Sequence, residues 1–365
     1  MQKTLNPNWI GLGLAIFLAF VQFRLIANVL GPSYGQSVEA AWGVVIGEPH
    51  WREVQSRVLA PYIVWALSKI FPHYLGAHVA FSVITLATAG FLAFRIGLRH
   101  GGDLMAALLA LLIFQAAFGF MLSRPWLYAW DYTELIAFLV FVEFVLSGRS
   151  WRWFAVLFAV AILNRESAFF IAIWMMLHPI CRWLLGRLDL TPVSPFDRAM
   201  ALAGLATMVI GAGVVHLLRQ TLLVAEAGPR LFRDAHLHQA ELARPLRNLE
   251  PNLQAAWASM AHPNYDMGFV VPLFVLLAVA CSIALAWRYP LQLLAFGLVS
   301  LGMATGAVAI AVLFETRILL NLVPVVLTAA LVLQRREVGW AKANATPNLA
   351  VLWRRAARRK QLAQA

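Results

Sequence analysis

The feature that most constrains this chain is the recurrence, from end to end, of apolar stretches of about 17 to 25 residues. A helix of that length crosses a hydrocarbon core of about 30 Å. Hydrophobic residues fill 61% of the 365 positions and charged residues only 13%, which is too little polar surface for a soluble globule of this size. A helix satisfies its own backbone in lipid, and the alternating pattern of a membrane barrel is absent. The sequence therefore predicts an all-α polytopic integral membrane protein.

About ten segments are candidate transmembrane helices, namely residues 9–30, 75–95, 103–121, 133–148, 152–164, 166–185, 199–220, 267–288, 290–313 and 316–333. The first follows a lone Lys3 and resembles a signal peptide, but it is long for one and has no A-x-A cleavage site, so we expect an uncleaved span. Residues 58–72 are short for a span and end at Pro72. We interpret them as an interfacial or re-entrant helix on the outer face, with a full crossing as the alternative.

Arginines recur at alternate junctions between these segments, which predicts the cytoplasmic side of the membrane. They are Arg95, Arg99, Arg149, Arg152, Arg182, Arg187, Arg198 and Arg288, followed by the basic residues of the tail. We expect a multi-pass protein of a bacterial inner membrane with cytoplasmic N- and C-termini. The sequence pI near 10.5 does not indicate nucleic-acid binding, because these cations lie between spans and not on a polar domain.

The chain is predicted to form a single transmembrane domain over residues 1–333 and a basic cytoplasmic tail over 334–365 that contacts anionic lipid headgroups. Two outer loops are longer than ordinary connections. Residues 31–74 contain the expected interfacial helix, and residues 221–265 contain a short helix around Leu253 to Met260. The two cysteines lie in apolar segments and suggest neither a disulfide framework nor a thiolate metal site.

Charged and polar residues gather at the outer ends of the predicted spans, whereas the inner turns are almost purely basic. Taken singly, each acid beside an arginine is a structural ion pair; together they predict a shared polar cavity that opens outward. Its candidates are Glu39, Glu48, Glu53, Arg57, Arg124, Asp131, Glu134, Asn164, Arg165, Glu166, Glu315 and Arg317.

The chemistry of such a cavity follows from its side chains. Carboxylates serve as general bases or metal ligands, and the planar guanidinium fork of arginine suits phosphate oxygens. Asp131 and Glu134 are spaced i and i+3, so they could hold a divalent cation if a helix begins there. Aromatic residues on the same side form either an interfacial belt or a stacking surface for sugars, and these are Trp42, Trp51, Tyr62, Trp65, Trp126, Tyr128 and Trp130.

In its succession of spans, long first outer loop and charged outer turns, the chain resembles the C-type (GT-C) membrane glycosyltransferases, which use polyprenyl-phosphate-linked sugars. The resemblance implies a GT-C-like fold, a lipid-linked sugar donor and a glycan or lipid acceptor. It also implies an acidic base in the first outer loop, for which Glu39, Glu48 and Glu53 compete in that order of preference. That loop has no aspartate and no paired acidic motif.

By position, the same resemblance assigns the lipid phosphate to Arg57, Arg165 and Arg317. The other residues expected to bind substrate are Arg124, Asn164, Glu166 and Glu315. Two further hypotheses stay open at this point. One is a transporter or flippase for a lipid-linked or anionic substrate, for which Glu143 inside a span is the best-fitting residue. The other is a noncatalytic partner in a membrane complex.

Overall fold

The computed structural model describes residues 6–31, 33–47, 56–121, 127–188, 195–222, 248–261, 270–288, 293–310 and 316–335. Every regular element in these ranges is a helix, and they contain no strand. The N-terminal half contains α1 (Pro7–Leu30), α2 (Ser33–Ile46), α3 (Leu59–Leu67), α4 (Tyr74–Gly101), α5 (Leu104–Met121), α6 (Ala129–Leu146) and α7 (Trp151–Ala161). It is followed by η1 (Glu166–Ala168), α8 (Phe169–Arg187), α9 (Arg198–Leu222), α10 (Leu249–Ala261), α11 (Val270–Arg288), α12 (Leu294–Ile310), η4 (Thr316–Leu322) and α13 (Val323–Arg335). The expectation of an all-helical chain is confirmed for these residues.

Each of the ten predicted segments coincides with a helix, but helix length and composition identify fewer candidate spans. Within the described ranges, five helical segments are long and apolar enough to cross a membrane: Pro7–Leu30, Tyr74–Gly101, Glu166–Arg187, Arg198–Thr221 and Val270–Trp287. Shorter apolar helices lie at α5, α7, α12 and α13. The helix α6 is 18 residues long but carries Asp131, Glu134 and Glu143. The structure thus supports a membrane protein, and the count of ten crossings stays a prediction.

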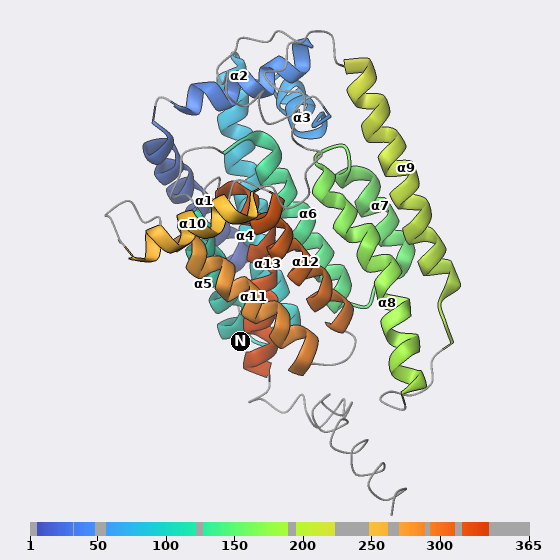
Figure 1. The fold of residues 1–365 in the computed structure, drawn as a ribbon. Helices are drawn as coiled ribbons and strands as arrows, with labels where there is room; N and C mark the ends of the chain where they lie inside the picture. Colours follow the sequence, from blue (N-terminus) through green and yellow to red (C-terminus); the bar gives the residue numbers. More distant parts are fainter. Residues whose placement is uncertain are drawn as a thin grey trace, which may run out of the picture.

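The long helices run side by side, and two short helices lie at one end of them (Figure 1). The two short helices are α2, which lies across that end, and α3, which follows it. The long helix α9 forms one edge of the bundle, beside α8. We call this the α2–α3 end. The other end, which we call the basic end, has the C-terminal ends of α4, α6 and α8, with Arg99, Arg149 and Arg187.

The two predicted short helices are present. Because α3 has nine residues, it is about 14 Å long and cannot cross a hydrocarbon core of about 30 Å as a helix. The fragment expected around Leu253 to Met260 is α10, which lies across the neighbouring helices in Figure 1. Asn252 of α10 donates a hydrogen bond from Nδ2 to the carbonyl oxygen of Val308 in α12, at 2.7 Å.

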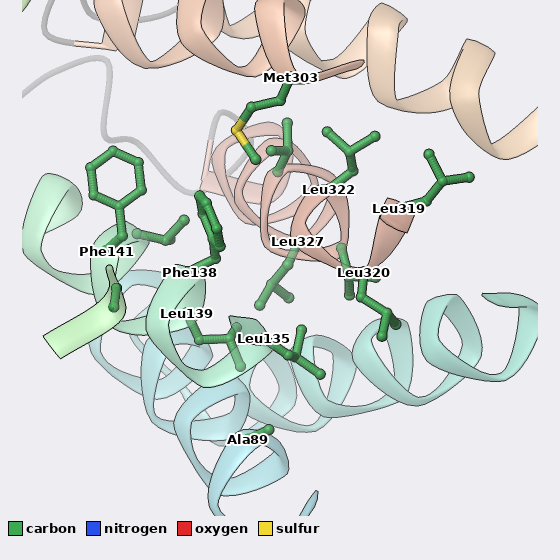
Figure 2. Close-up of a cluster of buried hydrophobic side chains, with 14 of the residues drawn as sticks. Ala89, Leu135, Phe138, Leu139, Phe141, Met303, Leu319, Leu320, Leu322 and Leu327 are labelled. Atoms are coloured by element: carbon green, nitrogen blue, oxygen red, sulfur yellow. The ribbon is translucent and has the colours of Figure 1, made fainter. Parts of the chain in front are cut away.

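The apolar core is centred on α6, η4 and α13. Figure 2 shows side chains of α6 facing those of η4 and α13, with Ala89 of α4 and Met303 of α12 on either side of them. Leu135, Leu139 and Leu327 are fully or almost fully buried there. Since α6 begins with Asp131 and Glu134, this core fixes the helix that presents the two acids.

Small residues allow the backbones of α4 and α5 to approach closely. A Cβ added at Gly97 would lie 2.6 Å from the Cβ of Ala110, 2.7 Å from the carbonyl oxygen of Ala106 and 2.8 Å from the Cα of Ala107. Two of these neighbours are backbone atoms, which cannot rotate away. Gly97 therefore sets the distance between the two helices.

This contact makes Gly97→Ala destabilising. We expect a loss of about 1–3 kcal/mol because the helices must separate to admit the methyl group. Thermal unfolding of the purified protein in detergent measures it. Gly13→Ala in α1 is the matched control, since nothing lies within 4 Å of its added Cβ and alanine favours the helix. Equal stability of the two variants would show that the α4–α5 contact is looser than described.

Candidate functional site

The acids of the candidate site lie in the first turns of α6. The chain enters this helix extended at Tyr128, whose backbone N–H donates to Oδ2 of Asp131 at 2.8 Å, so the carboxylate closes the first turn. The condition that Asp131 and Glu134 share a helical face is therefore met. Their side chains are 0% and 3% exposed, so each carboxylate needs a partner inside the protein.

That partner is Arg165, in the turn between α7 and η1. Its Nη1 donates to Oδ1 of Asp131 at 3.1 Å and to Oε2 of Glu134 in a short hydrogen bond. The preceding residue, Asn164, is also buried, and its Nδ2 donates to the carbonyl oxygen of Trp130 at 2.8 Å. One short turn thus secures both acids and the backbone carbonyl that precedes Asp131.

Arg317 approaches the same acids from the start of η4. Its Nη1 lies 3.9 Å from Oδ2 of Asp131, and its Cζ lies 4.5 Å from the centroid of the Tyr128 ring. The Tyr128 ring is stacked on Trp130, with 4.6 Å between centroids and 14° between planes. Both rings are buried, so they support the arginines and present no open stacking surface.

Arg57 is the third arginine of the site and lies just before α3. Its Cζ is 5.4 Å from the centroid of the Trp130 ring. Burial lowers the pKa of Arg57 to about 10, and the positive charge of Arg165 acts in the same direction. At neutral pH this guanidinium is still protonated. Its Nε is buried and has no hydrogen-bond partner within the part of the chain that the structure describes.

A third carboxylate, Glu166, lies beside this cluster. Oε1 of Glu166 accepts from Ser56 Oγ at 2.9 Å and from Nη2 of Arg219 in α9 at 2.8 Å. The backbone N–H of Leu59 also donates to the carbonyl oxygen of Leu163 at 3.0 Å. These bonds tie the segment before α3 to the Arg165 turn and to the far end of α9.

The structure brings together seven of the twelve predicted site residues: Arg57, Asp131, Glu134, Asn164, Arg165, Glu166 and Arg317. Four others, Glu48, Glu53, Arg124 and Glu315, lie outside the described residues. Glu39 is on the exposed side of α2, opposite the face formed by buried Ser37, Val38, Ala40 and Ala41. The sequence interpretation missed Arg219 and Ser56. Arg219 could have been noticed as a cation within two residues of the end of a predicted span.

The carboxylates are already engaged by arginine. Asp131 and Glu134 each give one oxygen to Arg165, and a cation between them would have to displace that guanidinium. Among the described residues, no group of three or more His, Cys, Asp or Glu side chains could hold a metal ion. We therefore assign no step of the chemistry to a metal, and the divalent cation expected at this pair stays an untested prediction.

Glu143, the other acid within α6, belongs to the basic end. Its carboxylate accepts from Nη1 of Arg99 at 2.7 Å and from Ser147 Oγ at 2.9 Å, and it lies 2.8 Å from Nε2 of His100. Arg99 and His100 are in the last turn of α4. The role best supported for Glu143 is to hold α4 and α6 together at this end.

Comparison of the chain with protein-family models, with curated proteins and with solved structures found no match. The site is therefore defined by its geometry: three arginines from three separate segments, two buried acids and a stacked aromatic pair.

The Arg165 bonds predict a large stability effect. We expect Arg165→Gln to cost about 3–5 kcal/mol, because it leaves Asp131 and Glu134 buried without their counter-charge. Adding Asp131→Asn and Glu134→Gln to that variant should restore part of the loss. Thermal unfolding in detergent is the measurement.

The matched control is Arg219→Gln, which breaks a partly exposed pair with side chains 38% and 28% accessible. It should cost no more than about 1 kcal/mol. An Arg165→Gln protein as stable as the control would mean that the two acids are not ionised partners of Arg165.

Proposed function

We propose that this chain is a membrane glycosyltransferase with a GT-C-like fold, which moves a sugar from a polyprenyl-phosphate donor to a glycan or lipid acceptor. We place the reaction at the extracytoplasmic face of a bacterial inner membrane, at the α2–α3 end, with both termini in the cytoplasm. The observation that carries the proposal is the convergence of Arg57, Arg165 and Arg317 on one buried cluster.

The charge of that cluster suits a departing phosphate. With the adjoining Glu166–Arg219 pair included, four guanidiniums meet three carboxylates among the described residues, which leaves a formal excess of one positive charge. Two buried atoms, Nε of Arg57 and Oε1 of Glu134, have no hydrogen-bond partner within the described ranges. Leaving a buried donor or acceptor without a hydrogen bond costs folding free energy. A phosphate oxygen can accept from Nε of Arg57, and a sugar hydroxyl can donate to Oε1 of Glu134.

In the proposed reaction, a carboxylate of the first outer loop removes the proton from the acceptor hydroxyl. The acceptor oxygen then attacks C1 of the sugar, the bond from C1 to the phosphate oxygen breaks, and polyprenyl phosphate leaves with inversion at C1. Arg57 and Arg317 stabilise the negative charge that develops on the phosphate, and Arg165 holds the acids that position them. Exposed Trp42, Tyr62 and Trp65 of α2 and α3 offer aromatic faces for sugar rings.

A transporter or flippase is less well supported. The acid that suited it best, Glu143, is engaged by Arg99 and His100 at the basic end. The remaining buried charges gather at the α2–α3 end, whereas transporters concentrate their sites near the bilayer midplane.

The test is a reconstituted transfer assay. Purified protein in proteoliposomes receives a panel of undecaprenyl-phosphate-linked hexoses and pentoses with a mixed glycolipid acceptor fraction. The readout is release of undecaprenyl phosphate, which does not depend on the identity of the sugar. Absence of release for every donor, with folded protein, argues against the proposal.

Arginine geometry gives a sharper prediction. We expect Arg57→Lys and Arg317→Lys each to lower the release rate roughly tenfold or more, since lysine keeps the charge but lacks the planar two-pronged donor. Arg152→Lys, at an exposed position of the basic end, is the control and should leave the rate unchanged. Wild-type rates in both site variants, at wild-type stability, would make these arginines purely structural.

The base is identified by substitution with the isosteric amide. Of Glu39→Gln, Glu48→Gln and Glu53→Gln, one should lose transfer while still binding undecaprenyl phosphate, because only the proton acceptor is removed. Glu39 is the first choice: it is accessible on α2, and no polar contact within the described residues engages it. Retention of transfer by all three variants would exclude the first loop and direct attention to Asp131 and Glu134.

A further inference from the structure

A cavity of about 330 Å³ lies at the basic end, on the opposite side of the bundle from the candidate transfer site. It is bordered by the end of α6, the middle of α8 and the beginnings of α7 and α9. The side chains that give it its chemistry are Arg149, Trp151, Trp174, His178, Arg182 and Asp197.

Arg149 is aimed by a specific turn at the end of α6. Gly148 adopts φ 59°, a left-handed conformation that glycine accepts without strain. The N–H of Arg149 then donates to the carbonyl oxygen of Phe144 at 3.0 Å, closing the helix. This geometry places Arg149 on the wall of the cavity and also on that of a neighbouring cavity of about 190 Å³ that borders Arg99 and Glu143.

The opposite wall is flat and aromatic. Trp174 and His178, one turn apart on α8, are stacked with 4.8 Å between ring centroids and 24° between planes. The acid of the cavity, Asp197, accepts the backbone N–H of Met200 at 3.0 Å and so caps α9. The described lining has two guanidiniums, those of Arg149 and Arg182, and one carboxylate, that of Asp197, which already accepts a backbone hydrogen bond. The lining is therefore electropositive.

We propose that this cavity binds a phosphate-bearing anion, either the phosphate of a membrane lipid headgroup or a free phosphate. Arg149 and Arg182 both line the cavity, and guanidinium groups are the side chains best suited to phosphate oxygens. The volume is at the small end of ligand pockets, enough for a phosphate with a glycerol-sized group. Because the cavity is at the basic end, this site is separate from the proposed transfer site and does not depend on it.

The test titrates the intact purified protein, in non-ionic detergent, with dihexanoyl phosphatidic acid and separately with inorganic phosphate, using isothermal titration calorimetry. Arg149→Gln and Arg182→Gln are each expected to raise the dissociation constant roughly tenfold, the loss of one charge-assisted hydrogen bond. Arg152→Gln is the matched control. It is an exposed arginine of the first turn of α7, outside the lining, with its Cζ 5.8 Å from the Trp151 ring, and should bind as the wild type does.

Binding of the lipid alone, weakened by the two cavity variants, identifies a headgroup as the ligand. Competition between the lipid and inorganic phosphate, weakened by the same variants, identifies free phosphate as a second source. The proposal is overturned if neither probe binds, or if Arg152→Gln weakens binding as much as Arg149→Gln does. All variants substitute exposed side chains, and unfolding temperatures confirm that they are folded. Calorimetry measures binding at this cavity and not sugar transfer. Failure of the cavity proposal and failure of the proposed function are therefore seen in different assays.

Discussion

The α2–α3 end of the molecule depends on one interaction, the engagement of two buried carboxylates by Arg165. Removing two ionised acids from water costs several kcal/mol each unless a cation meets them, so Asp131 and Glu134 cannot be buried until the turn after α7 has closed against α6. That closure brings Asn164 to the carbonyl of Trp130 and Leu163 to the amide of Leu59. Three segments that are separated in sequence are thus fixed by one guanidinium and its neighbours.

A bundle that needed only to span a membrane could do so with an apolar end. Replacing a buried ion pair with well-packed apolar residues is often neutral or stabilising, so stability alone gives little reason to keep five charges here. Function gives a better one, since ionisable groups at membrane depth are concentrated where proteins bind or move polar substrates. Under the proposed function, a substrate's polar groups meet the atoms of Arg57 and Glu134 that have no hydrogen-bond partner among the described residues.

Helix positions could be predicted from the sequence because burial in lipid requires a nearly continuous apolar run, and each predicted run coincides with a helix. A short helix was predicted over residues 58–72 with its end at Pro72, but α3 already ends at Leu67, with Ser68 as its C-cap. The common face of Asp131 and Glu134 followed from their spacing. Their capture by Arg165 could only be suspected, since sequence spacing does not say which of several cations closes a distant contact. Arg219 was missed because a cation near the end of a span looks the same whether it pairs or snorkels. The exposure of Glu39 could not be predicted either, because it depends on which face of α2 packs against the bundle.

The helix α6 has ionic contacts near both of its ends. Asp131 and Glu143 are 12 residues apart, or about 18 Å along the axis, and each is engaged by cations of a different neighbouring segment. A helix held in this way can neither slide nor turn about its axis without breaking both sets of contacts, so α6 is the fixed element of the bundle. By contrast, α9 is the least buried of the five candidate spans, with 17% of its window inside the protein, and half-exposed Arg219 holds it at one end. Under the proposed function, a long lipid chain that enters between helices meets the least resistance at α9, while α6 keeps the charged groups in register.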